Sequence, residues 1–193
     1  MPVSFLVRIF FWAWFGAAIA TGHFLLLQRL PAAATPALTL ALAALLLLVY
    51  YRIGAVRSWV DSLDIRALVL VSVTRFVGIY LLLLYQRGEL PRVFAMPRGV
   101  TDVIVATMAL PVVFAPLEAA SRRRAIVIWN VVGFAGLVMT LFTAFRINLQ
   151  HPMPLRALTH LPLSLLPTFL TPLLLATHVI IFNRTRRQEN ESS

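Results

Sequence analysis

Long stretches without a charged residue dominate this chain. Twenty residues separate Arg8 from Arg29, and a further twenty-two, from Leu30 to Tyr51, contain no Asp, Glu, Lys or Arg. About twenty helical residues, each rising 1.5 Å, cross the roughly 30 Å hydrocarbon core of a bilayer. The remaining stretches are 67–86, which is interrupted only by Arg75, and 103–117, 125–145 and 157–183.

This pattern predicts an all-α membrane protein, a bundle of six transmembrane helices. The connections are short and rich in Pro and Gly, and none is long enough to fold by itself. The one between the third and fourth spans is expected to contain Gly88, Pro91, Pro97 and Gly99. We therefore expect one transmembrane domain over 1–183, followed by a cytoplasmic tail over 184–193. The helices are expected near 5–27, 36–52, 65–85, 101–118, 125–146 and 163–182.

Composition supports lipid as the solvent of this protein. Of the 193 residues, 60% are hydrophobic and only 12% are charged, with a mean hydropathy of +0.87. A soluble domain carries about 25% charged residues, so an ordinary water-soluble fold and a disordered chain are both excluded. The absence of cysteine excludes disulfides, thiolate metal ligands and a cysteine nucleophile.

Arginine sets the expected orientation, because all 17 basic residues are Arg and the net charge is +10. The arginines are spread between apolar stretches, which favours membrane topology over nucleic-acid binding. With both termini in the cytoplasm, ten arginines lie inside and six outside, so this orientation is predicted. The inner set is Arg8, Arg52, Arg57, Arg66, Arg122, Arg123, Arg124, Arg184, Arg186 and Arg187, and the outer set is Arg29, Arg87, Arg92, Arg98, Arg146 and Arg156.

A cleaved signal peptide is the alternative interpretation of the first helix. Arg8 precedes an apolar stretch, and Ala18-Ile19-Ala20 has the small-x-small pattern of a cleavage site. The bulky Trp12 and Trp14, and the apolar residues that continue through Leu27, favour an uncleaved membrane helix.

Arg75 is the first candidate for function, because it lies about ten residues from either end of the third span. A cation there costs a few kcal/mol unless it is paired or hydrated. Asp102, at the expected outer start of the next helix, is the natural counter-ion. Two structural alternatives remain: Arg75 bonds helix carbonyls or extends outward to the interface, and Thr101 or Asp102 caps its helix.

Asn130 and His178 form a second candidate pair. Each lies about five residues from the cytoplasmic end of its predicted helix, so the two share a depth in the membrane. They are expected to form a hydrogen bond if these helices pack together. Such a pair serves either as an interhelical contact or as catalytic chemistry.

The four histidines raise the question of haem, which facing helices often ligate with two imidazoles. His23 and His178 are expected at opposite depths, so they cannot share one iron. His151 and His160 belong to an outer loop and could approach His23, but without the spacing of metal ligands. We expect no metal site, and no residue pattern identifies a cofactor.

Asp61-x-x-Asp64 is similar to the start of the CDP-alcohol phosphotransferase motif, whose carboxylates hold two Mg²⁺ ions. Here Ile65 replaces the glycine that follows in that family, and no Asp occurs between Asp64 and Asp102. The carboxylates for two metal ions are therefore missing. Ser62 or Asp64 is instead expected to cap the third helix.

Small, proline and tryptophan residues predict packing features. Small residues spaced by four, such as Ala18-x-x-x-Gly22, mark places where helices approach closely. Pro162, Pro167 and Pro172 are expected to kink the last helix and free carbonyls that need new partners. The tryptophans are expected mostly near the cytoplasmic interface as anchors: Trp12, Trp14, Trp59 and Trp129.

Several segments over roughly 70–182 together resemble a group of uncharacterised bacterial inner-membrane proteins with six helices. The resemblance implies that Arg75, Asn130 and His178 belong to a recurring pattern. It also implies that an Asp often stands where this chain has Gly136, a departure that weakens a carboxylate proton relay here. The segments are Arg75-x-x-Gly78-x-Tyr80, Gly88-Glu89-Leu90-Pro91, Trp129-Asn130-x-x-Gly133, Leu161-Pro162-Leu163 and Pro167-Thr168-Phe169, with Pro172 and His178.

Three functions fit these observations. The first is a bacterial inner-membrane protein that binds or transports a small amphipathic or anionic ligand through a polar site of Arg75, Asp102, Asn130 and His178. The second is a membrane-embedded enzyme acting on a lipid or quinone, with His178 as the acid-base group. The third is a structural or assembly subunit that meets a membrane-protein partner or a further copy of itself. The sequence contains no signature that decides whether it is an enzyme.

Overall fold

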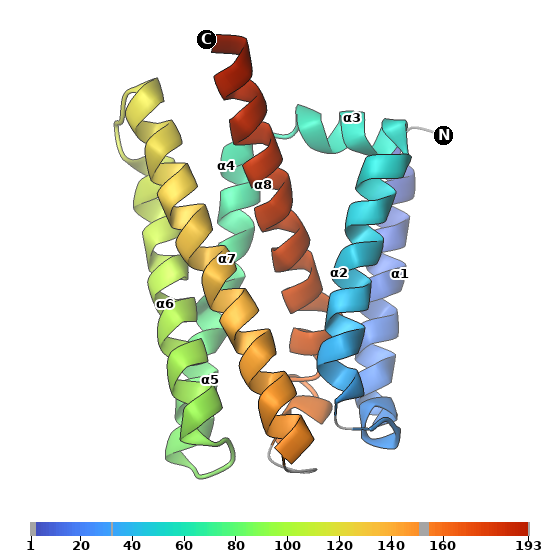
Figure 1. Ribbon diagram of the computed structural model, residues 1–193. Coiled ribbons are helices and arrows are strands. Elements are labelled where there is room, and N and C mark those ends of the chain that lie inside the picture. The colour runs from blue at the N-terminus through green and yellow to red at the C-terminus, as the bar shows by residue number, and fades with distance from the viewer. Residues whose placement is uncertain (1–2, 32, 151–154, 193) are drawn as a thin grey trace. The chain divides into compact units, whose positions relative to one another are not determined.

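The computed structural model describes residues 3–31, 33–150 and 155–192, and all regular elements in these ranges are helical (Figure 1). The contacts divide the chain into two compact units. Unit 1 comprises Met1–Leu63 and Ala144–Ala176, and unit 2 comprises Asp64–Thr143 and Thr177–Ser193. Two helices, α7 (Ala119–Gln150) and α8 (Thr171–Ser192), contribute residues to both units.

Among the described residues, six helical segments are long and apolar enough to cross a membrane. The predicted all-α fold with six potential spans is therefore confirmed, whereas the single domain and the orientation stay predictions. The segments are Val3–His23, Ala34–Arg52, Ile65–Gln86, Arg92–Phe114, Ala119–Gln150 and Leu166–Arg187.

The fourth span begins earlier than predicted. α6 (Arg92–Phe114) starts nine residues before the expected residue 101, and Pro97 and Gly99 lie inside it. A proline within a helix removes one backbone hydrogen bond, yet the helix continues through Pro97 to Phe114. The expectation that Pro97 and Gly99 belong to a connecting loop is therefore wrong.

The fifth span is longer than its charge-free window. α7 has 32 residues instead of the expected 125–146, which corresponds to about 48 Å at 1.5 Å per residue. Arginine is a good helix former, so the helix continues through Arg122, Arg123 and Arg124 beyond the apolar window. α7 is therefore longer than the roughly 30 Å thickness of a hydrocarbon core.

Unit 1 holds α1 (Val3–His23), α2 (Ala34–Arg52), α3 (Gly54–Ser62) and short 3₁₀ turns at Leu26–Arg29 and Arg156–Thr159. The sequence did not predict α3. Tyr50, which is buried, donates its hydroxyl hydrogen bond to Asp61 at 2.8 Å, and Arg57 lies 3.8 Å from the same carboxylate. These contacts fasten α3 to the end of α2.

Prolines interrupt the regular hydrogen bonding of the last span in its unit 1 part, as the sequence predicts. A π-helical turn, Leu166–Leu170, precedes α8. Pro172 has no backbone N–H. It therefore cannot donate to the carbonyl of Thr168, its partner in an α-helix, or to the carbonyl of Pro167, its partner in a π-helix. Trp14 Nε1 donates to the carbonyl of Thr168 at 3.0 Å, and Thr39 Oγ1 donates to the carbonyl of Pro167 at 2.9 Å.

Aromatic and small residues complete the packing of unit 1. The ring of Phe169 lies 4.6 Å from that of Trp14 and 5.0 Å from that of Phe11, measured between centroids. Trp14, which is half-buried, is therefore a packing residue and a hydrogen-bond donor, and its expected role as an interface anchor stays a prediction. Ala18 and Gly22 are the buried residues of α1, and this spacing confirms the predicted close approach.

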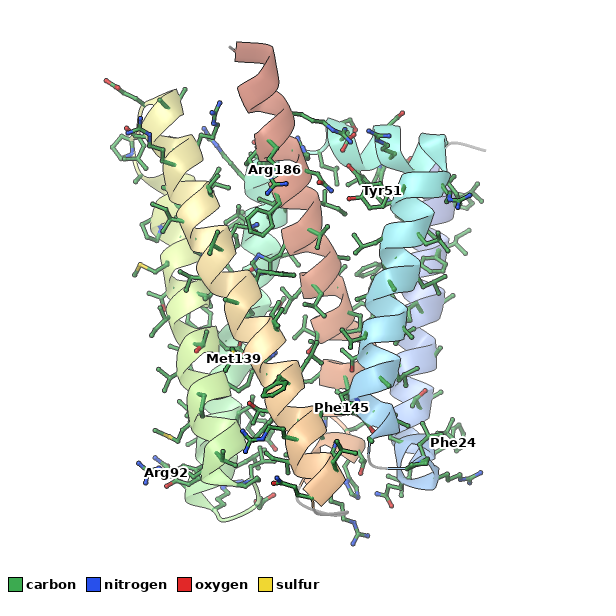
Figure 2. The ribbon with its side chains drawn as sticks, in the orientation of Figure 1. Phe24, Tyr51, Arg92, Met139, Phe145 and Arg186 are labelled. Atoms are coloured by element: carbon green, nitrogen blue, oxygen red, sulfur yellow. The ribbon has the colours of Figure 1, made fainter. Side chains whose placement is uncertain are left out.

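Large apolar side chains also cover the outside of the molecule. Met139 on α7, which is labelled in Figure 2, is 62% exposed. Trp12 is 68% exposed and Ile128 is 65% exposed. Water would make such a surface costly, whereas hydrocarbon tails accept it without penalty. The fold is that of a multi-pass membrane protein.

Candidate ligand-binding site

Arg75 lies in an irregular part of its span. The span Ile65–Gln86 is built from α4 (Ile65–Leu70), a 3₁₀ segment (Val71–Phe76) and α5 (Val77–Gln86). Asp64 caps α4 by accepting a hydrogen bond from the Arg66 amide at 2.9 Å, as predicted. A 3₁₀ stretch inside a longer helix often marks a functional or strained position, and here it carries the buried Arg75.

Two glycines bring the neighbouring helix against this segment. A Cβ added to Gly78 on α5 would lie 2.7 Å from the carbonyl oxygen of Gly99 and 2.8 Å from Cβ of Asp102, both on α6. Real side chains do not approach so closely, so only glycine allows this crossing. Arg75 lies about one helical turn before Gly78, so this crossing places Asp102 within reach of the Arg75 side chain.

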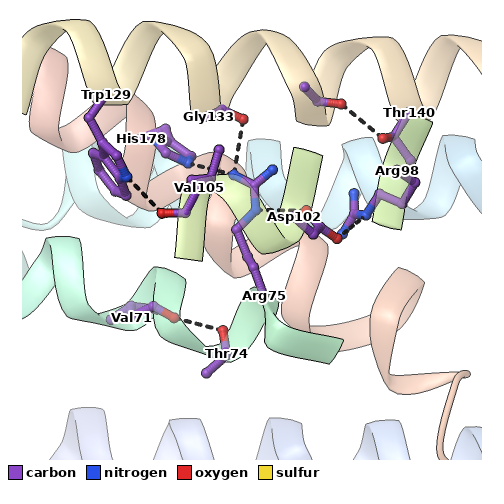
Figure 3. Close-up of polar contacts among 11 residues, drawn as sticks. Val71, Thr74, Arg75, Arg98, Asp102, Val105, Trp129, Gly133, Thr140 and His178 are labelled. Carbon is purple, nitrogen blue, oxygen red and sulfur yellow. Dashed lines mark hydrogen bonds and ion pairs between the residues drawn. The ribbon is translucent and has the colours of Figure 1, made fainter. Parts of the chain in front are cut away.

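The predicted pairing of Arg75 with Asp102 is confirmed. Arg75 Nε donates to Asp102 Oδ1 at 2.7 Å, and Arg75 Nη1 donates to the carbonyl oxygen of Gly133 on α7 at 3.1 Å (Figure 3). Both charged side chains are buried, so Arg75 does not extend to the interface. Asp102 lies ten residues inside α6, which excludes the alternative that it caps this helix.

Arg98 belongs to the same group, although the sequence interpretation placed it in an outer loop. Its side chain is 3% exposed, and its Nε lies 2.5 Å from Asp102 Oδ2. The signal was present, because Arg98 and Asp102 are separated by four residues and so share one face of a helix. We call Arg75, Arg98 and Asp102 the arginine–aspartate cluster.

The arginine–aspartate cluster carries more positive than negative charge. Two guanidinium groups face one carboxylate, which leaves a formal charge of +1. Within the described part of the chain, Arg75 Nη2 and Arg98 Nη1 are buried without a hydrogen-bond partner. Buried charged donors without partners are costly, and an acceptor that meets them would lower that cost.

Asn130 and His178 hold each other as the sequence predicts. Asn130 Nδ2 donates to the backbone carbonyl of His178 at 3.0 Å, so Asn130 Oδ1 is left as the acceptor for His178 Nδ1 at 2.6 Å. This network assigns the ring proton to Nδ1. His178 Nε2 is then an acceptor, and it lies 3.4 Å from Arg75 Nη1.

The four residues predicted for the site therefore meet in unit 2. They form one series of contacts, from Asn130 through His178 and Arg75 to Asp102. Gly133 is required at this point, because an added Cβ would lie 2.6 Å from Cε1 of His178. Gly136 also lies beside the unpartnered nitrogen: its added Cβ would lie 3.5 Å from Arg75 Nη2 and 2.5 Å from Cγ2 of Thr101, whose side chain fills the adjacent space.

Trp129 also supports this site, which corrects its expected role as an interface anchor. The side chain is buried and donates from Nε1 to the carbonyl of Val105 at 2.9 Å. Its ring lies 5.3 Å from the imidazole of His178, measured between centroids. Trp129 thus packs one side of His178 and ties α7 to α6.

The other two histidines that the structure describes, His23 and His160, are not among the residues of this site. His23 is exposed in unit 1, and His160 is exposed with its Nε2 3.0 Å from Gln28 Nε2. His151 lies outside the described residues. In the described ranges, no three His, Asp or Glu side chains form a group suited to a metal ion.

The fold defines the class of protein, a multi-pass helical membrane protein. A family model, described as a domain of unknown function (DUF8737), matches residues 32–186, and the chain belongs to this family. The resemblance to an uncharacterised group is thereby confirmed. No curated protein and no solved structure matches the chain.

Proposed function

We propose that this protein resides in a bacterial inner membrane and binds, or transports, a small anionic or amphipathic ligand at the arginine–aspartate cluster. The observation that carries the proposal is the surplus of buried cationic donors. Arg75 Nη2 and Arg98 Nη1 have no hydrogen-bond partner among the residues that the structure describes, and the cluster has a formal charge of +1. One negative group would neutralise the cluster.

A carboxylate or phosphate suits these donors. Guanidinium groups bind both anions with short, charge-assisted hydrogen bonds. Asp102 acts as the counter-ion in the empty site, because it contacts both arginines. An anion that approaches Arg75 from the side of Nη2 does not need to displace Asp102 from Nε.

Asn130 and His178 have a positioning role in this proposal. His178 Nδ1 faces Asn130 at 2.6 Å and Nε2 faces Arg75 at 3.4 Å, so both ring nitrogens have neighbours. This arrangement orients the guanidinium of Arg75. It favours binding over the enzyme hypothesis, which needs a ring nitrogen directed at a substrate.

Thermal unfolding of the purified protein in detergent tests the proposal with three probes that share one chain length. Octyl phosphate and octanoate carry an anionic group, whereas octanol does not. We expect the two anions to raise the unfolding temperature at concentrations at which octanol has no effect, because a ligand stabilises the state that binds it.

Arg75→Gln is the decisive variant. It leaves Arg98 paired with Asp102, so the remaining buried charges balance and the protein is expected to fold. The variant should lose the response to both anions. Arg87→Gln, at an exposed arginine of unit 2, is the matched control and should respond like the wild type. Equal responses of Arg75→Gln and the wild type would contradict the proposal.

Transport is separated from binding by flux. Proteoliposomes should accumulate whichever of the two anions stabilises the wild-type protein, and Arg75→Gln should abolish this accumulation. Stabilisation by the anion without flux would reduce the proposal to binding alone.

The proposed orientation has both termini in the cytoplasm. Because Arg98 is buried within α6, it no longer belongs to the outer set, and the arginine count becomes ten inside against five outside. Alkaline phosphatase fused after residue 90 should be active in the periplasm, and the same enzyme fused after residue 122 should be inactive. The reverse pattern would overturn the orientation.

A further inference from the structure

A second basic site lies at one end of unit 2. It is a cleft of about 560 Å³ between the start of α4, the start of α7 and Thr185 of α8. We call it the arginine cleft, because Arg66, Arg122 and Arg123 line it. Its volume is within the range of small-molecule sites. None of its lining residues belongs to the arginine–aspartate cluster.

The arginine cleft has a surplus of positive charge. Three guanidinium groups line it, and Asp64 is the acidic residue among its lining residues, which leaves a formal charge of +2. Asp64 already accepts the amide hydrogen bond of Arg66 at 2.9 Å as the cap of α4. The cleft is therefore suited to an anion.

Arg122 is fixed in position before any ligand binds. Its Nη2 donates to the backbone carbonyl oxygens of Ala115 at 2.9 Å and Leu117 at 3.2 Å. Its Nε is buried and has no hydrogen-bond partner in the described part of the chain. An anchored guanidinium with a vacant donor loses little freedom when it binds an acceptor.

The backbone adds to the attraction. α7 begins at Ala119, which also lines the cleft, and its first turn contains no acidic side chain. The first amides of a helix have no partner within the helix, and the dipole favours an anion at this end. The arginine cleft also lies at the ends of the spans, since α6 ends at Phe114, shortly before the lining residues Leu117 and Ala119. Lipid phosphates lie at this level of a bilayer.

We propose that the arginine cleft binds a phosphate group, with Arg66, Arg122 and Arg123 around its oxygens. Arginine forks match phosphate geometry, and basic pockets at the cytoplasmic ends of membrane helices hold lipid headgroups. The phosphate is supplied either by a phospholipid headgroup or by a soluble phosphate ester. This site is independent of the ligand proposed for the arginine–aspartate cluster.

Native mass spectrometry of the full chain distinguishes the two sources. The protein is extracted gently and mixed with phosphatidylglycerol or, separately, with a neutral lipid of the same acyl chains, diacylglycerol. In a further arm, glycerol 3-phosphate is added alone and also in competition with the lipid. A headgroup site retains phosphatidylglycerol at least threefold more than diacylglycerol. A soluble-ester site binds glycerol 3-phosphate and releases the lipid.

Three variants locate the site. Arg66→Gln changes an exposed side chain, so folding is expected to persist, and it should lower phosphate-dependent retention about threefold. Arg66→Gln combined with Arg122→Gln should abolish it. The controls are Arg92→Gln, at the opposite end of α6, and Arg75→Gln, which should both retain the ligand.

Two results would overturn the proposal. The first is equal retention of phosphatidylglycerol and diacylglycerol together with no binding of glycerol 3-phosphate. The second is retention by Arg66→Gln and by the double variant equal to that of Arg92→Gln. Loss of binding in Arg75→Gln alone would concern the other site, so the two proposals fail separately.

Discussion

The two units treat polar groups within apolar surroundings in different ways. In unit 1, prolines free the carbonyls of Pro167 and Thr168, and one neutral donor meets each of them, from Thr39 and Trp14. In unit 2, Arg75 and Arg98 share the single carboxylate of Asp102, and two of their nitrogens lack a hydrogen-bond partner within the described ranges of the chain. At these two carbonyls of unit 1 each acceptor has one donor, whereas the arginine–aspartate cluster of unit 2 has charged donors in excess.

This difference separates buried polar groups that stability explains from buried polar groups that point to a function. A neutral donor that meets a freed carbonyl satisfies a backbone group and joins two segments, so stability alone explains it. An excess of buried charged donors costs free energy that packing does not recover. A bound anionic ligand would explain the excess of buried guanidinium donors in unit 2.

The largest effect is expected from Asp102→Asn, which removes the shared carboxylate and leaves two buried guanidinium groups unneutralised. We expect a loss of about 3 to 5 kcal/mol in the free energy of unfolding, measured in mixed detergent micelles. Asp64→Asn, at the exposed cap of α4, is the control and should cost about 1 kcal/mol or less.

Recovery of stability by further substitutions sharpens this prediction. Arg75→Gln added to Asp102→Asn leaves Arg98 unpaired, so the double variant should regain only part of the stability. Further replacement of Arg98 by Gln removes the last charge and should restore most of it. If the double variant were already as stable as the triple variant, Arg98 would not share the carboxylate.

Gly78→Ala should have the next largest effect. Its new Cβ would meet the carbonyl oxygen of Gly99 at 2.7 Å, and a backbone atom cannot rotate away. We expect a loss of about 1 to 3 kcal/mol, by the same unfolding measurement. Gly16→Ala in unit 1 is the matched control, because nothing lies within 4 Å of its added Cβ. Equal effects at the two glycines would contradict the close crossing of α5 and α6.

Trp14→Phe tests the matched polarity of unit 1 with a smaller change. The ring remains in place beside Phe169, but the carbonyl of Thr168 loses its donor. Pro172 cannot replace that donor, so we expect a cost of about 1 kcal/mol. Trp12→Phe, at an exposed ring on the same helix, is the control and should leave stability unchanged.

Trp129→Phe in unit 2 should cost least, roughly 0.5 kcal/mol. Its acceptor, the carbonyl of Val105, lies within α6 and keeps the hydrogen bond of the helix itself, so it is not left unsatisfied. Thermal unfolding of Trp14→Phe and Trp129→Phe side by side measures the difference. A larger cost for Trp129→Phe would show that its contact with His178 carries additional stability.

Much of the site was accessible from the sequence because charge is scarce in the spans. Arg75 needs a partner in an apolar environment, and Asp102 is close to the expected spans, so pairing was nearly the only choice. The equal depths of Asn130 and His178 followed from helix length alone. Arg98 was missed because Pro97 and Gly99 beside it were interpreted as the end of a loop.

The sequence by itself determined the six spans, since a bilayer requires about twenty apolar residues for each crossing and leaves no alternative to internal backbone hydrogen bonding. The tertiary structure alone decided where α6 begins and that Arg98 shares Asp102. It also decided that the half-buried Trp14 and the buried Trp129 donate hydrogen bonds to backbone carbonyls. The reason is physical: a hydropathy pattern describes each helix against lipid, whereas partners depend on how closely two helices cross. At Gly78 and Gly99 that distance is set by the absence of two side chains, and it decides which charges meet.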